Sequence, residues 1–226
     1  GKHKKMKLDL HVHCGLSPCS KADVEVTVNA YAESGVNFVL TNHYAEIYTT
    51  AAGGAYPESE YADIYIDRYN KVKKYADKLG VKTFFGMEIG IVMPDCPYAE
   101  FLLYGITTDI LKSAPHIYGM GQKQLYEFCA SNGIALIQAH PYRKEQGHFP
   151  HDPEFMDGVE INCHPVYLRE ESRVRDFAAT HNLRITAGSD FHVVGGQALG
   201  GIEVDASNEK ELAKKILAGE YNIFLR

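Results

Sequence analysis

The sequence predicts an α/β barrel, chiefly because strand-like and helical segments alternate along the chain. Short apolar runs of β character are followed by segments with helical spacing, which favours a parallel sheet joined by crossover helices. The runs Phe38–Leu40 and Ile134–Ile137 are continuously apolar, as expected for strands that are buried on both faces. About seven or eight strand–helix units close a barrel. An open doubly wound sheet is the alternative, but no glycine-rich dinucleotide fingerprint follows a strand.

The order of elements follows from apolar periodicity and from helix end signals. Strands are expected over residues 7–10, 37–40, 81–85, 101–104, 134–137, 158–161, 183–186 and 221–225. Helices are expected over residues 23–34, 61–79, 122–131, 169–181 and 209–217. Asp23 is a candidate N-cap for the first helix, and Gly35 and Gly80 follow the first two helices, where glycine is favoured. The stretch 49–59 is the clearest flexible loop.

Length, charge and cysteine usage narrow the class of protein. The 226 residues suit a single domain, which we place at residues 6–226. The net charge of −6 argues against nucleic acid as a partner but is compatible with a small anionic substrate if cations are bound. No apolar run approaches the ~20 residues that a membrane span needs. The basic residues 1–5 lack the apolar stretch of a signal peptide, and the five cysteines form no CxxC pair, so we expect a cytoplasmic protein with reduced thiols.

Histidines and acids recur at the carboxyl ends of the expected strands. Asp9, His11 and His13 alternate at the end of the first strand, so alternation places them on one side. The other candidates each follow a later strand: His43, Glu88, His140, Asp190 and His192. In a barrel these strand ends share one face, which is where active sites are built. His11, His13, His43, Glu88, His140, Asp190 and His192 are therefore expected to converge.

The composition of this group predicts a metal centre. Five imidazoles and two carboxylates in one pocket are awkward as free groups but are natural ligands of Zn, Mn or Fe. One ion does not normally need seven protein ligands, so the set favours a multinuclear site. Any one of these histidines alone is more often an ordinary polar residue. Seven ligand-type residues at strand ends are hard to obtain by chance.

These residues lie in motifs that resemble those of the PHP (polymerase and histidinol phosphatase) family. The resembling segments are Asp9–His13, Thr41–His43, Gly86–Ile89, Ala139–Pro141 and Gly188–His192. The resemblance implies a distorted seven-stranded (β/α) barrel that carries about three divalent ions. It also implies that His11, His13, Glu88 and Asp190 hold one ion, that Glu88 bridges to a second ion also bound by His140, and that His43 and His192 hold the third.

Some positions depart from the family pattern or leave a ligand open. The second motif usually has aspartate where this chain has Asn42, and an amide cannot supply the same negative charge. Cys19 stands at about the spacing of a further ligand of the third ion, and a thiolate there would favour Zn. The second ion needs another ligand, for which Glu100 and His116 are the candidates, with Glu100 favoured.

The resemblance implies a metal-dependent phosphoric ester hydrolase. A small phosphomonoester of the sugar, nucleotide or histidinol phosphate type is the expected substrate, hydrolysed by metal-activated water. Asp190 belongs to the catalytic metal site, His192 or His43 is the candidate proton donor, and Arg143 is the first choice for a phosphate clamp. Arg169 and Arg173 come next.

Further residues and functions remain open at this point. His164 and the tyrosine-rich segment 44–61 are candidates for the pocket wall, whereas His148 and His151 are interpreted as loop residues. The alternatives to a phosphomonoesterase are a nuclease or phosphodiesterase on short nucleic acids and a metal-binding regulatory module without catalysis. An amide hydrolase on the same scaffold is a weaker alternative.

Overall fold

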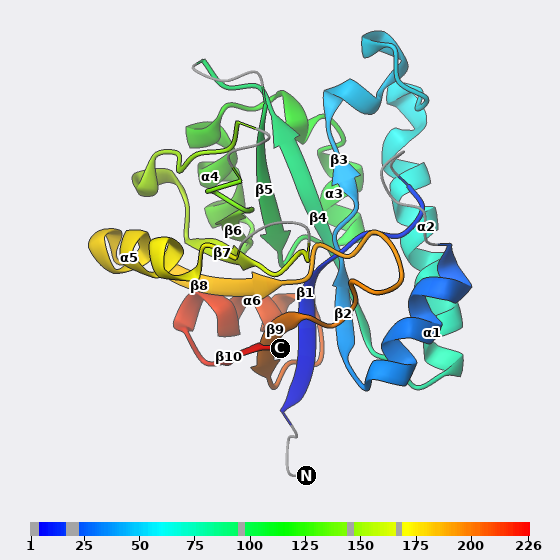
Figure 1. Cartoon of the computed structure of the whole chain (residues 1–226). Coiled ribbons are helices and arrows are strands. Elements are labelled where there is room, and N and C mark those ends of the chain that lie inside the picture. Colours follow the sequence, from blue (N-terminus) through cyan, green and yellow to red (C-terminus); the bar gives the residue numbers. More distant parts are fainter. Residues whose placement is uncertain (1–4, 17–22, 95–97, 144–146, 166–168) are drawn as a thin grey trace.

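Ten strands form one sheet in the part of the chain that the computed structural model describes, which is residues 5–16, 23–94, 98–143, 147–165 and 169–226. The strands run in the spatial order β10-β9-β1-β2-β4-β5-β6-β7-β8, with β3 paired to β4 (Figure 1). Their bounds are β1 Met6–Val12, β2 Asn37–Leu40, β3 His43–Tyr44, β4 Thr83–Ile91, β5 Ala99–Tyr104, β6 Ala135–Gln138, β7 Gly158–Asn162, β8 Arg184–Gly188, β9 Gly200–Val204 and β10 Asn222–Leu225.

The sheet is mixed rather than parallel throughout. β1, β2 and β4 pair in parallel, as do β6, β7 and β8, in agreement with the predicted strand–helix units. The strands β4, β5 and β6 are antiparallel neighbours, and β9 is antiparallel to both β1 and β10. The expectation of an all-parallel sheet was wrong for these strands, because β4 and β5 are joined as a hairpin without a crossover helix.

The last strand in the order, β8, returns to β1, which produces a nearly closed, barrel-shaped sheet. Val12 of β1 and Phe191, just beyond β8, form a parallel bridge. The His13 amide donates to the Phe191 carbonyl (2.9 Å), and the Phe191 amide donates to the His11 carbonyl (3.2 Å). Gly188 permits this approach, since a Cβ at that position would lie 2.5 Å from His11 Cβ. The predicted barrel class is confirmed, with ten described strands where the resemblance implied seven.

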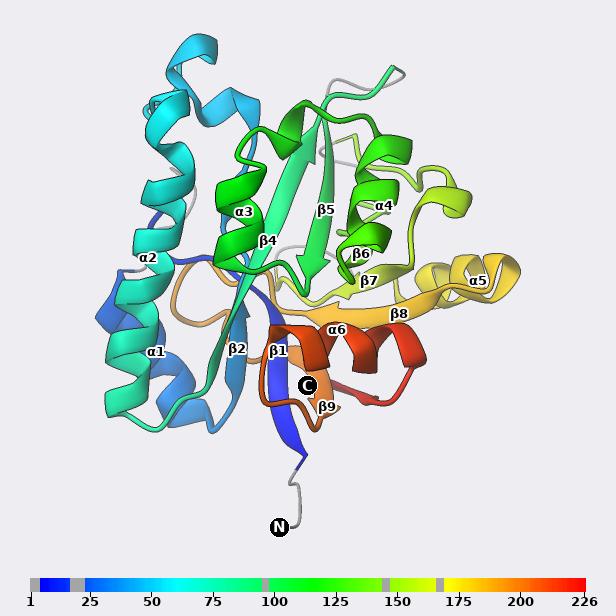
Figure 2. The ribbon, with the colours of Figure 1, turned by 180° about the vertical axis from the view of Figure 1, so that it is seen from behind.

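Six α-helices accompany the sheet in the described ranges: α1 Val24–Ser34, α2 Glu58–Lys78, α3 Thr108–Ser113, α4 Gln122–Ser131, α5 Glu171–His181 and α6 Glu209–Ala218. Asp23 caps α1 by accepting from the Val26 amide, and Gly35 ends it in a left-handed conformation, as predicted. The predicted loop 49–59 is partly regular, because it contains a 3₁₀ turn, Thr50–Ala52, and the start of α2. Seen from behind, α3, α4 and α6 cover the outside of the sheet (Figure 2).

The strands β3 and β9 and the helix α3 were not predicted. The strand β9 begins with Gly200 and Gly201, and glycine is depleted in strands, so its sequence carries little β signal. The strand β3 has only two residues and exists because it pairs with β4. Short elements of this kind depend on their neighbours rather than on local sequence.

One end of the barrel is filled with apolar side chains. A buried cluster joins Leu8 and Leu10 of β1 and Tyr104 of β5 to Leu212 and Ile216 of α6. The helix α6 therefore packs against residues from several strands at this end. Burial of such side chains removes apolar surface from water and stabilises the barrel. No described helix combines the length and the apolar character that a membrane crossing requires.

Asp9 holds three parts of the barrel together. Its buried carboxylate accepts hydrogen bonds from the Tyr31 hydroxyl of α1 (2.6 Å), the His11 amide (3.2 Å) and the Ser189 amide beyond β8 (3.0 Å). Burial is the largest influence on this carboxyl and raises its pKa to about 6 against the opposing effect of these donors. Asp9 thus joins β1 to α1 and to the segment that closes the barrel.

We predict that Tyr31→Phe lowers the free energy of unfolding by about 1–3 kcal/mol, because it leaves a buried Asp9 oxygen without its donor. Urea denaturation of the metal-free protein measures this change. Tyr75→Phe is the control, since the Tyr75 hydroxyl donates to Asn29 Oδ1 at an exposed position (3.4 Å). Equal stability of the two variants would contradict the role given to Asp9.

Candidate metal centre

Most of the predicted ligands meet at the end of the barrel opposite the apolar cluster. They come from β1 and the residue after it, from β3, from the middle of β4, from β5, and from the turns after β6 and β8. The register places His43 of β3 directly beside Glu88 of β4. The residues brought together are His11, His13, His43, Glu88, Glu100, His140, Asp190 and His192.

The first group comprises His11, His13, Glu88 and Asp190, all of them buried. The Nε2 atoms of His11 and His13 lie 3.2 Å apart. Glu88 Oε1 is 3.1 Å from His11 Nε2 and 3.0 Å from His13 Nε2, and Asp190 Oδ1 is 3.2 Å from each of them. Four donor atoms from three strands or strand ends thus surround one point.

The spacing of this group fits a metal ion better than hydrogen bonding. Donor atoms bound to one tetrahedral ion at about 2.0–2.1 Å lie about 3.3–3.4 Å apart. Glu88 Oε1 and Asp190 Oδ1 accept no hydrogen bond within the described residues, although imidazole nitrogens surround them. Buried carboxylate oxygens in native proteins normally have partners, and a cation would compensate both. The residues present therefore fit a divalent ion.

Glu88 connects the first group to a second one. Its other oxygen, Oε2, lies 3.1 Å from His140 Nε2. Glu100 Oε1 is 3.5 Å from His140 Nε2 and 3.4 Å from the Nε2 of His148, a residue interpreted from the sequence as part of a loop. Glu100, His140 and His148 form a group whose donor atoms could hold an ion. The carboxylate of Glu88 is thus placed to bridge two positions.

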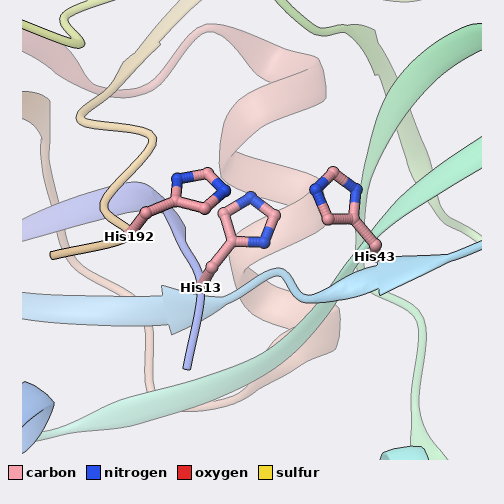
Figure 3. Close-up of side chains that lie close together, drawn as sticks. All are labelled: His13, His43 and His192. Carbon is pink, nitrogen blue, oxygen red and sulfur yellow. The ribbon is translucent and has the colours of Figure 1, made fainter. Parts of the chain in front are cut away.

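A third group consists of the rings of His13, His43 and His192, which lie together in the close-up (Figure 3). The ring centroid of His13 is 4.4 Å from that of His43 and 4.1 Å from that of His192. His192 Nδ1 lies 2.8 Å from the Asp190 carbonyl and can donate to it, which leaves Nε2 as the ligand atom. Since His43 Nδ1 is also 3.1 Å from Glu100 Oε2, the third group adjoins the second.

Glu160 and Asn162 of β7 support the ligands, and the sequence reasoning missed both. His11 Nδ1 donates to Glu160 Oε2 (2.6 Å), so that Nε2 faces the first group. Glu160 Oε1 accepts from the His140 amide (3.1 Å) and from Asn162 Nδ2 (3.0 Å). The alternation of these two polar residues in a buried strand, Gly158–Asn162, was the available signal.

Arg143 does not stand alone as a phosphate clamp. Its Nη2 lies 2.5 Å from Asp190 Oδ2, and the two side chains are 8% and 2% exposed. The side-chain Nδ2 of Asn162 also donates to this Asp190 oxygen, at 3.2 Å. Asp190 is therefore held on one oxygen by Arg143 and Asn162, while its other oxygen faces the first group.

Asn42 has a structural partner that explains the amide. Its Oδ1 accepts from the Cys14 amide (2.7 Å), and its Nδ2 donates to the Cys14 carbonyl (3.4 Å). A carboxylate could make the first contact but not the second. Asn42 thus fixes the backbone that follows His13.

The remaining sequence candidates are not members of these groups in the part of the chain that the structure describes. His116 is exposed and its Nδ1 lies 3.3 Å from the Tyr118 hydroxyl, so the structure does not bring it to the second group. Cys19 lies outside the described residues. Arg173 stacks over the Tyr142 ring at 4.2 Å. Arg169 lines a small pocket together with His140 and Arg143.

Two candidate wall regions lie close to the histidines. The ring of His164 is 6.3 Å from that of His192, and the ring of Tyr48 is 5.6 Å from that of His43. Tyr48 belongs to the predicted wall segment 44–61. Tyr44 and Tyr61 of the same segment are buried and stack on each other at 4.3 Å, so they serve the core.

The charges in the centre favour ionised carboxylates. Burial alone would raise the pKa of Asp190, but His11 and His13 hold that pKa well below its usual range. Burial alone would lower the pKa of His11. The nearby carboxylates of Asp190, Glu160 and Glu88 instead raise that pKa well above its usual value. The pKa of His148 falls to about 4, first because it is buried and then because His140 is near. Metals bind ionised carboxylates and neutral imidazoles, so a cation bound here would take the place of the proton that these carboxylates favour on His11.

No family model matches the chain, and no curated protein matches its sequence. Solved structures do match. A two-domain protein from Bacteroides vulgatus that contains a predicted PHP-like metal-dependent phosphoesterase has a TM-score of 0.66 and 15% identity, over 98% of this chain and 65% of that chain. A suggested metal-dependent phosphoesterase from Bifidobacterium adolescentis has a TM-score of 0.54 and 16% identity, over 94% of this chain and 96% of that one.

A further match is an amidohydrolase from Chromobacterium violaceum, solved with bound sulfate and no metal. Its TM-score is 0.54 at 13% identity, over 97% of this chain and 98% of that one. At these identities the likeness is one of fold. The chain has the fold of PHP-like metal-dependent phosphoesterases, and it spans 65% of the two-domain protein from Bacteroides vulgatus.

We predict that Glu160→Gln weakens the binding of zinc by about 10–100-fold. Both Glu160 oxygens accept hydrogen bonds, so the amide of glutamine must place its NH₂ group against one of these donors. The substitution also removes the negative charge that faces His11 Nδ1. Titration with a competing chelator measures the affinity. Glu154→Gln, at an exposed position, is the control. Equal affinities would remove Glu160 from the support of the centre.

Proposed function

We propose that this protein is a metal-dependent hydrolase of the PHP type that cleaves a small phosphomonoester. The observation that carries the proposal is the joining of three ligand groups through one buried carboxylate, Glu88. About three divalent ions, drawn from Zn, Mn or Fe, suit a set of imidazoles and carboxylates of this size. The fold shared with PHP-like phosphoesterases supports the same assignment.

Ions bound in this centre would neutralise charge on a phosphoryl group and make water a stronger acid at neutral pH. The protein residues have separate tasks around them. His11, His13, Glu88 and Asp190 hold the first position, and Arg143 and Asn162 keep Asp190 oriented. Preorganised charges of this kind stabilise the transition state because they do not have to move during the reaction.

Proton transfer to the leaving group is proposed for His192 or His43, and it requires a ring nitrogen that an ion at the third position leaves free. Both rings lie at the more open side of the centre, with side-chain exposures of 17% and 10%. His192 is oriented by the contact of its Nδ1 with the Asp190 carbonyl. A histidine near the reacting group, with an ordinary pKa close to neutrality, is a common general acid.

Arg143 is proposed to bind the phosphoryl group in addition to orienting Asp190. A guanidinium presents five N–H donors in a planar fork, and Arg143 contacts Asp190 through Nη2. Arg143 also lines the cavity that contains Arg169, which gives that cavity two guanidinium groups. Planar forks of donors suit phosphate oxygens.

A small substrate is favoured over nucleic acid. The net charge of −6 provides no general attraction for a polyanion. Hydrolysis of an amide is the second candidate, because the matching protein from Chromobacterium violaceum is an amidohydrolase. A panel of phosphomonoesters, short oligonucleotides and amide substrates separates these classes.

We predict that the Mn- or Zn-loaded protein releases phosphate from one or more small monoesters. Asp190→Asn should reduce this rate by about 10²–10³-fold, since it removes a charged ligand from the first group. Release of inorganic phosphate measures both rates. Asp67→Asn, on the exposed face of α2, is the matched control.

Two results would contradict the proposal. Full turnover in Asp190→Asn would show that the metal centre is not the site of reaction. Metal binding without turnover of any phosphoester in the panel would favour the amide hydrolase or the non-catalytic regulatory module, depending on whether an amide substrate is cleaved.

We predict that Arg143→Ala lowers kcat/KM for a phosphomonoester by about 10–100-fold, because both Asp190 and the phosphoryl group lose a donor. Arg143→Lys keeps the charge without the fork and should fall between wild type and alanine. Steady-state kinetics measures the effect. Arg175→Ala, which breaks only an exposed pair with Glu171, is the control, and an unchanged kcat/KM in Arg143→Ala would remove Arg143 from the site.

A further inference from the structure

We propose that His148 is a protein ligand of the second metal position, where it completes a set formed by Glu88, Glu100 and His140. This inference rests on the proposed metal dependence and deepens it, because it names the residue that fills the remaining coordination place. The sequence alone placed His148 in a loop, outside every motif.

The position of the His148 ring supports a direct role. The side chain is buried, although it lies in a connection between β6 and β7. Its Nε2 is 3.4 Å from Glu100 Oε1, and its ring centroid is 4.5 Å from that of His140. A direct hydrogen bond would normally bring nitrogen and oxygen to about 2.9–3.0 Å. Separations near 3.3–3.4 Å are those expected of two atoms that share a tetrahedral ion.

The backbone around His148 is tied down on both sides. The His148 amide donates to the Arg143 carbonyl (3.1 Å). Gln138 of β6 donates through Nε2 to the Phe149 carbonyl (2.7 Å) and accepts at Oε1 from the His151 amide (2.9 Å). Gln138 is itself buried at the end of its strand. These bonds hold the connection against β6 and fix the direction of the histidine, as a metal ligand requires.

The second position would differ from the third in how completely protein side chains surround the ion. Glu100, His140 and His148 form one group, and Glu88 Oε2 lies 3.1 Å from His140 Nε2, so together they would supply as many ligands as a tetrahedral ion takes. Sites filled by protein alone are usually structural. The third group offers only histidines in the part of the chain described and includes the more exposed His192. The geometry therefore assigns retention of an ion to the second position and contact with substrate to the more open side.

Metal content is the decisive measurement, because it needs no substrate. We expect His148→Ala and His148→Asn to lose one equivalent of zinc per chain, or to release it to a chelator at least ~10-fold faster than wild type. Asparagine can still hydrogen-bond to Glu100 but is a poor zinc ligand. Rescue by asparagine would therefore overturn the ligand assignment in favour of a hydrogen bond.

His151→Asn is the matched control. His151 is buried in the same connection, three positions along, but its ring lies 4.8 Å from Phe149 and belongs to none of the ligand groups. Circular dichroism of the metal-free proteins checks that all variants fold. If the His148 variants keep the zinc content and release rate of His151→Asn, the proposal is wrong.

The outcomes for His148 and for the function are separable. Loss of an ion in the His148 variants, with no phosphoester cleaved by wild type, would support the ligand and overturn the function. Phosphate release by wild type, with unchanged metal content in both variants, would support the function and overturn the ligand.

Discussion

The buried carboxylate of Glu88 is the group on which the polar end of the barrel depends. One of its oxygens lies 3.0–3.3 Å from nitrogens of His11, His13 and His43, and the other lies 3.1 Å from His140. A charge without solvent is costly unless opposite charge or a cation compensates it. Burial would raise the pKa of Glu88, but His11 and His43 hold that pKa well below its usual range. The histidines that surround Glu88, or a cation bound among them, supply this compensation.

The antiparallel hairpin β4–β5 makes that arrangement possible. The strand β4 continues past its pairing with β2, and its extension carries Glu88 while β5 carries Glu100. The two-residue strand β3 pairs with the same extension and brings His43 alongside. Three ligands therefore come from adjacent strands with fixed register, which restrains their positions more tightly than flexible loops would.

The residues that stabilise the barrel by apolar packing and the residues that could bind metal lie at different ends of it. The apolar cluster with α6 lies at one end, and the ligands lie at the other, supported by Glu160, Asn162 and Asp9. Asp9 belongs to none of the ligand groups, but it joins β1 to α1 and to the segment after β8. The strand β1 therefore takes part both in the closure of the barrel and in the positioning of the centre.

The sequence by itself determined the barrel class and most of the ligand group, because apolar periodicity and the placement of histidines and acids at strand ends are local properties. It predicted the α1 cap and the convergence of residues as far apart as His11 and His192. Only the tertiary structure showed that Glu100, and not His116, lies beside His140, and that His148 lies there too. It also paired Arg143 with Asp190 and revealed the contact of Glu160 with His11. These outcomes depend on hairpin register and on contacts between segments far apart in the chain, which no local pattern encodes.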